Sequence, residues 1–176
     1  MSYKEEMIRA MNLLAEDDRV IFLGQNLLYR GSTVYETMQG VSDSRKIEMP
    51  VAEELQMGVS IGLSLEGYIP VTCYPRMDFL MRAMDQLVNH LDKISEMTVG
   101  RFVPKVLVRT VIGGKQPLEP GPQHCQDHTE LLKVALPNVE VFKLENAWTI
   151  VPTYKMCLNA PHSSILVEYA EKIRQE

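Results

Sequence analysis

The spacing of apolar residues along the chain predicts helices and strands in turn. From residue 3 to residue 16, apolar side chains recur every three or four positions between charged ones, which is typical of an amphipathic helix. Similar patterns predict helices at 34–38, 52–65, 79–94 and 148–158, and the pattern is most regular at 79–94. Short apolar runs predict strands. These runs cover residues 20–23, 46–49, 69–74, 106–112, 139–143 and 164–168.

This alternation indicates an α/β fold. Parallel strands need crossover connections, and the crossover helices cover both faces of the sheet. We therefore expect a three-layer α/β/α domain with a mostly parallel central sheet. The sequence contains no internal repeat, low-complexity tract or linker, so residues 1–176 are expected to form a single domain.

The least regular segment of the chain follows one of the predicted strands. Residues 113–126 contain three glycines and three prolines, which argues against regular structure. In parallel sheets, ligands bind beyond the carboxyl ends of the strands. Irregular loops inside compact domains are often functional. We therefore expect this loop to contribute to a binding site.

Composition and charge exclude several classes of protein. A formal net charge of −5 argues against non-specific binding to nucleic acid, which needs a basic surface. The N-terminal segment is charged where a signal peptide needs an apolar run, and no stretch approaches the roughly 20 apolar residues of a membrane span. Three scattered cysteines suggest neither a disulfide framework nor a zinc site. We expect a cytoplasmic protein without a metal site of its own.

An acidic pair opens the predicted helix at 52–65. Glu53 and Glu54 lie in its first turn, just after Pro50, and Gly67 is placed to end the helix. Carboxylates at a helix start complement the positive end of the helix dipole, and this structural role is the common one. The residues alone leave Glu53 and Glu54 equivalent.

Several short motifs occur in the order and spacing of one family. They are Pro50-Val-Ala-Glu-Glu, Gly58 and Gly62, Gly67-Tyr-Ile-Pro-Val, Asp78-Phe79, Asp85-Gln86-Leu-Val-Asn89, Val106-Leu-Val-Arg109-Thr, Gly113-Gly114 and Gln123-His124-Cys-Gln126. With these motifs the chain resembles the pyrimidine-binding domain of thiamine-diphosphate enzymes. It is most similar to the beta subunits of 2-oxoacid dehydrogenase first components, and transketolase is more distant. The resemblance covers nearly the whole chain.

The resemblance implies roles for three residues. In the family, a glutamate at a helix start hydrogen-bonds the aminopyrimidine of thiamine diphosphate and activates the cofactor, and Glu53 occupies that position. Phe79 falls where the family stacks an aromatic ring on the aminopyrimidine, although a Phe in an amphipathic helix is otherwise most often a core residue. His124 falls where the family has a histidine near the reacting carbon, and histidine can handle protons near neutral pH.

The resemblance also implies a partner. The family's Gly-Asp-Gly…Asn motif, which holds magnesium and the diphosphate, does not occur in the sequence, and we expect no C-terminal domain of the kind that the beta subunits carry. We therefore expect a partner subunit with the diphosphate-binding domain and the magnesium. The resemblance also implies that this chain pairs with a second copy of itself, in a homodimer or in a two-plus-two heterotetramer. Gln25-Asn26, Leu55-Gln56 and Cys125 also depart from the family pattern.

The resemblance favours one function and leaves two alternatives. The favoured function is that of the pyrimidine-binding subunit of a split enzyme, which decarboxylates a 2-oxo acid and transfers the acyl or aldehyde unit. Transketolase-like transfer of a ketol unit is the second enzymatic possibility. The non-enzymatic alternative is a degenerate domain that serves as a scaffold or regulatory partner.

Overall fold

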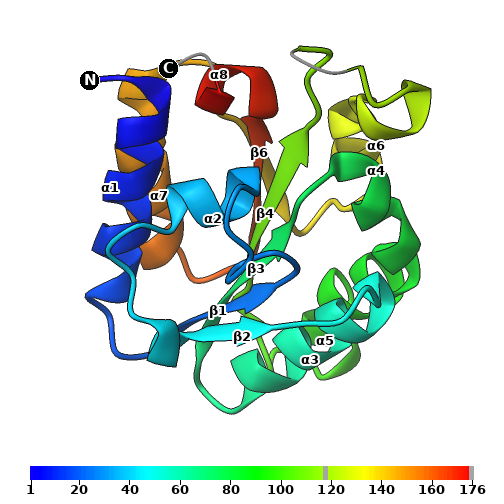
Figure 1. The fold of residues 1–176 in the computed structure, drawn as a ribbon. Helices are drawn as coiled ribbons and strands as arrows, with labels where there is room; N and C mark the ends of the chain where they lie inside the picture. Colours follow the sequence, from blue (N-terminus) through cyan, green and yellow to red (C-terminus); the bar gives the residue numbers. More distant parts are fainter. Residues whose placement is uncertain (117–118, 175–176) are drawn as a thin grey trace.

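The chain folds around one sheet of six parallel strands, shown in a computed structural model that describes residues 1–116 and 119–174 (Figure 1). The strand order is β2-β1-β3-β4-β6-β5. Their bounds are β1 (Val20–Gly24), β2 (Lys46–Glu48), β3 (Ile69–Tyr74), β4 (Leu107–Ile112), β5 (Glu140–Lys143) and β6 (Ser164–Tyr169). All six predicted strands form, so the predicted three-layer fold is confirmed.

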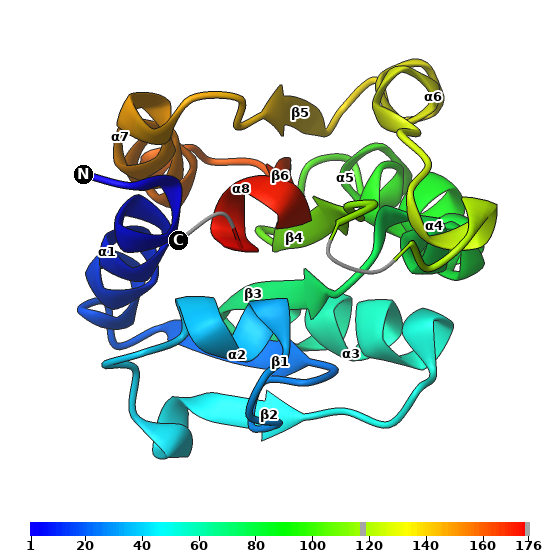
Figure 2. The same cartoon turned by 45° about the horizontal axis from the view of Figure 1, so that its top comes forward.

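Helices cover both faces of the sheet. They are α1 (Tyr3–Ala15), α2 (Thr33–Thr37), α3 (Glu53–Leu65), α4 (Met77–Leu80), α5 (Ile94–Met97), α6 (Thr129–Ala135), α7 (Ala147–Asn159) and α8 (Ala170–Arg174). In Figure 2 the sheet lies between α1 and α7 on one side and α3 to α6 on the other. Each side has its own apolar core. Successive residues of β6 alternate between these cores: Leu166 packs in one, and Ile165 and Val167 pack in the other.

The end of α3 shows how the local sequence sets an element boundary. Gly67 has φ +90°, a left-handed conformation that glycine adopts without steric cost. The N–H of Tyr68 donates to the carbonyl of Leu63, and the N–H of Gly67 donates to that of Ser64. This pair of bonds is a Schellman motif. It confirms Gly67 as the helix stop and directs the chain into β3.

The prediction of one regular helix at 79–94 is wrong, because the backbone hydrogen-bond pattern changes along this segment. The chain is helical there, but α4 leads into a 3₁₀ turn at Met81–Ala83, and Gln86–Leu91 is a π-helix before α5 begins. Changes of helical register of this kind often occur at functional sites. Apolar spacing predicted the buried face, which includes Leu87 and Leu91, and could not predict the register.

Two short helices had no counterpart in the sequence prediction. Helix α6 begins after Asp127, whose carboxylate accepts from both the N–H and the hydroxyl of Thr129. Helix α8 continues directly from β6. The loop at 113–126 is irregular apart from a single 3₁₀ turn at Pro122–His124, and residues 117 and 118 lie outside the described part of the chain. Among the described residues, no helix combines the length and apolar character that a membrane span requires.

Candidate active site

The predicted site residues gather at the carboxyl ends of the strands. Strand β1 lies between β2 and β3, so the chain leaves β1 toward one side and later returns to its other side. In parallel sheets such a reversal opens a crevice in which ligands bind. Gln25 and Asn26 follow β1 there, and Arg76 and Phe79 follow β3.

Glu53 is the first residue of α3, and its side chain is only 3% exposed. One carboxylate oxygen, Oε1, accepts a hydrogen bond of 3.2 Å from the amide of Gln25. The hydroxyl of Tyr74 donates to the backbone carbonyl of Glu53 at 3.1 Å, which ties the helix start to the end of β3. The carboxyl group of Glu53 is therefore held at a defined place beside the carboxyl end of β3.

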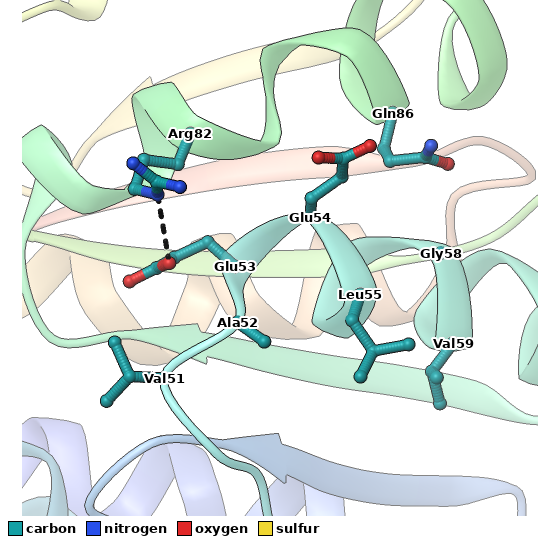
Figure 3. A pocket seen from close by; sticks show the side chains of 9 residues that line it. All are labelled: Val51, Ala52, Glu53, Glu54, Leu55, Gly58, Val59, Arg82 and Gln86. Carbon is teal, nitrogen blue, oxygen red and sulfur yellow. Dashed lines mark ion pairs between the residues drawn. The ribbon is translucent and has the colours of Figure 1, made fainter.

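A cavity of about 720 Å³ opens in front of Glu53 (Figure 3). The second carboxylate oxygen, Oε2, lies 3.6 Å from Nε of Arg82, whose side chain is 78% exposed. Glu54 is exposed and lines the same cavity, where Figure 3 shows it extending toward Gln86. The two glutamates therefore differ in burial. The carboxylate of Glu53 is buried against Gln25, whereas the side chain of Glu54 is exposed to solvent. Leu55, one of the departures from the family pattern, is 54% exposed at this cavity.

Phe79 and His124 meet beside a second, smaller cavity of about 160 Å³. Their ring centroids are 5.4 Å apart, with an angle of 81° between the ring planes, which is an edge-to-face contact. The Nδ1 atom of His124 is buried and has no hydrogen-bond partner among the described residues. The structure therefore brings Phe79 and His124 together, whereas Glu53 lines the other, larger cavity.

Gly113 holds the His124 loop against β4. A Cβ atom at this position would overlap the backbone carbonyl oxygen of His124. We expect Gly113→Ala to lower the free energy of unfolding by about 1–3 kcal/mol, because overpacking against backbone forces the loop to shift. Urea unfolding monitored by circular dichroism measures this change.

Gly62→Ala is the matched control for that substitution. Gly62 is exposed in α3, and a Cβ there would have no neighbour within 4 Å. Alanine should stabilise the isolated chain by about 0.5–1 kcal/mol through helix propensity alone. Equal unfolding midpoints for Gly113→Ala and the unmodified chain would contradict the tight loop contact.

Sequence reasoning missed the part that two glutamines play. Gln25 was noted only as a departure from the family pattern, yet it is the residue that donates to Glu53. Gln56 was noted in the same way, and its fully buried amide donates to Thr72 and to the carbonyl of Cys73. Gln56 therefore fastens α3 to β3, and it is not among the described residues that line the two cavities. Both contacts join residues far apart in sequence, so no local pattern predicts them. The only signal in the sequence was that both glutamines depart from the family pattern.

A buried ion pair lies on one face of the sheet, between side chains of β4 and β6. The guanidinium of Arg109 on β4 forms two hydrogen bonds with the carboxylate of Glu168 on β6, from Nε at 2.7 Å and from Nη2 at 2.9 Å. Thr37 of α2 and Tyr154 of α7 complete the cluster. It lies on the α1–α7 side and fastens four elements together.

The fold and the site define a class of protein: a parallel α/β domain with ligand-binding residues beyond the carboxyl ends of its strands. These residues are a buried carboxyl and an aromatic–histidine pair. Residues 3–174 match the family described as the transketolase pyrimidine-binding domain, and the chain belongs to this family. This result confirms the resemblance seen in the sequence.

Curated relatives of the chain include 2-oxoacid dehydrogenase beta subunits. The chain is 30% identical over 145 residues to the 3-methyl-2-oxobutanoate dehydrogenase subunit beta of Mycobacterium tuberculosis, and the match covers 75% of this chain and 41% of that protein. It is 29% identical over 121 residues to the mitochondrial pyruvate dehydrogenase E1 component subunit beta of Ascaris suum, covering 66% and 32%. The chain thus spans less than half the length of these relatives.

Solved structures show the same fold. One is described as a split gene transketolase, inactive beta4 tetramer; it has a TM-score of 0.75 and 21% identity over 97% of this chain and 52% of that chain. A transketolase from Campylobacter jejuni has a TM-score of 0.73 and 15% identity, covering 97% of this chain and 26% of that chain.

Proposed function

We propose that this chain is the pyrimidine-binding half of a split thiamine-diphosphate enzyme that decarboxylates a 2-oxo acid and transfers the acyl or aldehyde unit. The observation that carries the proposal is the placement of Glu53 in the site. Its carboxyl is buried at a helix start, is fixed by Gln25 and faces a cavity of about 720 Å³. The names of the relatives favour a 2-oxo acid as the substrate.

The residues present fit the pyrimidine end of the cofactor. Oε1 of Glu53 is bonded to Gln25, whereas the one contact of Oε2 among the described residues is the 3.6 Å approach of Arg82. Oε2 is therefore available for a hydrogen bond with a ring nitrogen. The side chain of Arg82 is 78% exposed, so it has room to turn into water when the cofactor ring takes its place beside Oε2. When bound, thiamine diphosphate supplies the carbon nucleophile.

Phe79 and His124 have separate tasks in this proposal. Phe79 offers an aromatic ring for stacking on the aminopyrimidine, and its edge-to-face contact with His124 fixes the orientation of both rings. His124 holds or transfers a proton near the substrate, a task that histidine performs near neutral pH. Its unpartnered Nδ1 atom is consistent with a bond that forms only in the assembled site.

A partner subunit completes the proposed site. The sequence contains no Gly-Asp-Gly motif, so we assign the diphosphate and the magnesium to a second chain. A two-plus-two heterotetramer would place the cofactor between this chain and that partner, and a homodimer of this chain is the alternative assembly. We propose a cytoplasmic location, which agrees with three free cysteines.

Calorimetry tests this function. The chain, assembled with the subunit that carries a Gly-Asp-Gly motif, should bind thiamine diphosphate in the presence of magnesium, and the chain alone should bind it much more weakly. Turnover with 2-oxo acids rather than ketose phosphates is then expected. Preference for ketose phosphates would replace the proposed reaction with ketol transfer. An assembled complex that binds no cofactor would leave a scaffold role instead.

A further inference from the structure

The smaller cavity carries positive charge. Arg76, from the segment after β3, and Arg174, from α8, both line this space of about 160 Å³ together with Phe79 and His124. None of the described residues that line it is acidic. About 10–15 Å³ of such space is enough for one water molecule, so the cavity has room for a small charged group.

The charge of Arg76 is poorly compensated. Its Nη1 atom donates to the carbonyl of Pro75 at 2.6 Å, and no ion pair joins it to a carboxylate in the described part of the chain. Burial lowers the pKa of Arg76, and the nearby charge of Arg174 lowers it further. Together they outweigh the effects of Cys125 and Asp78, which act on this pKa in the opposite direction. Asp78 is close in sequence, but its carboxylate accepts from Gln126 and does not line the cavity.

Three residues of the cavity have buried polar atoms without partners among the described residues. They are Nε of Arg76, Oγ1 of Thr33 and Nδ1 of His124. Buried polar side-chain atoms nearly always have a hydrogen-bond partner, so each exception needs an explanation. A bound ligand with several acceptor oxygens would provide partners for all three.

We infer that this cavity is a subsite for the carboxylate or phosphate group of the substrate, bound by the guanidinium groups of Arg76 and Arg174. Guanidinium matches the planar geometry of a carboxylate and the oxygens of a phosphate with two parallel hydrogen bonds. Assignment of the anion to the substrate rests on the proposed function, because Phe79 and His124 line the same space. The subsite would then orient the substrate beside His124.

Titration of the full chain tests the subsite without cofactor or partner. Pyruvate and ribose 5-phosphate are the anionic probes, and methyl pyruvate and ribose are their neutral counterparts. The ¹⁵N-resolved arginine Nε–H resonances report binding at Arg76 and Arg174. We expect the anions to shift both resonances and the neutral compounds to shift neither. Tighter binding of pyruvate would identify a carboxylate subsite, and tighter binding of ribose 5-phosphate a phosphate subsite.

Variants then connect binding to the two side chains. Arg76→Gln and Arg174→Gln should each weaken anion binding about tenfold or more, as expected for loss of a hydrogen bond between charged groups. Arg101→Gln, at an exposed position outside the cavity, should leave affinity unchanged. Unchanged affinity in both cavity variants, equal binding of the neutral compounds, or no response to any anion would overturn the subsite. Arg174 is exposed, so its variant remains informative if Arg76→Gln fails to fold.

Failure of the subsite and failure of the proposed function are distinguishable. If the assembled complex binds thiamine diphosphate but the anions do not bind, the subsite alone is wrong. If the anions bind and the complex never binds the cofactor, an anion site exists and the proposed function is wrong.

Discussion

Arg109→Met should lower the free energy of unfolding by about 3–5 kcal/mol, because the substitution leaves the carboxylate of Glu168 buried without its counter-charge. Arg109 is 2% exposed and Glu168 is fully buried. Two parallel hydrogen bonds join the guanidinium to the carboxylate, and this attraction offsets the cost of burying both charges. A single replacement removes the attraction and keeps the cost of burying the remaining charge.

The neighbours of this ion pair explain why the structure cannot easily adapt to its loss. Tyr154 donates to Oε1 of Glu168 at 2.5 Å, and Thr37 lies 2.9 Å from Nη2 of Arg109. Burial disfavours the charged guanidinium, but the attraction of Glu168 outweighs it and raises the pKa of Arg109 well above its ordinary value. Burial also raises the pKa of the nearby Cys73 thiol to about 11, so Cys73 stays neutral and supplies no charge.

Urea denaturation measures the predicted loss. Arg101→Met, at an exposed position, should change stability by less than about 0.5 kcal/mol. If Arg109→Met is too unstable to measure, Arg109→Lys retains the charge without the second parallel bond, and an intermediate loss is expected. A loss below about 1 kcal/mol for Arg109→Met would show that the pair adds little to the fold.

The sequence was sufficient for the sheet because the strand signals are local. The strand at 69–74 has the predicted bounds, since Gly67 ends the preceding helix and Pro75 follows the last ladder residue. Buried parallel strands are continuous apolar runs, which stand out from the amphipathic helices. The strand order β2-β1-β3-β4-β6-β5 could not be predicted from local patterns, because it depends on how the crossover connections pack against one another.

The helical segment between β3 and β4 shows the opposite case. Apolar residues on one face led to the prediction of one regular helix, whereas three helical registers occur in turn. The choice between them depends on tertiary packing, such as the burial of Leu80 and Leu87 against the same core. Helix α6 was missed because its seven residues carry too little periodic signal.

The candidate site was predictable only where a family motif marks it. Glu53 could be singled out from Glu54 through the family register, and the structure shows that the two differ in burial. No local signal connects Gln25 with Glu53, or Arg76 with Arg174, because each pair comes together only when the strands align. Polar groups that meet across the end of a sheet are a property of topology, which a linear pattern does not contain.

Glu53→Gln should lower kcat of the assembled enzyme by about 10²–10⁴-fold, the range that proton transfer by a positioned side chain contributes. Glutamine has nearly the same shape and can still form hydrogen bonds at the start of α3, but it cannot exchange a proton with a ring nitrogen. The hydrogen bond to Gln25 can persist after rotation of the amide, so the fold should be unaffected. Steady-state turnover of the complex with saturating thiamine diphosphate measures the effect.

Glu54→Gln is the control that separates chemistry from helix electrostatics. Both glutamates lie in the first turn of α3, so both substitutions remove one favourable charge near the helix N-terminus. If the role of Glu53 were only to complement the helix dipole, the two variants would show equal, small losses of stability and similar turnover. If Glu53 acts on the cofactor, only Glu53→Gln loses turnover, while its cofactor affinity, measured by calorimetry, stays within about tenfold because one hydrogen bond is at stake. Turnover of Glu53→Gln within a few-fold of the unmodified enzyme would remove Glu53 from the catalytic machinery.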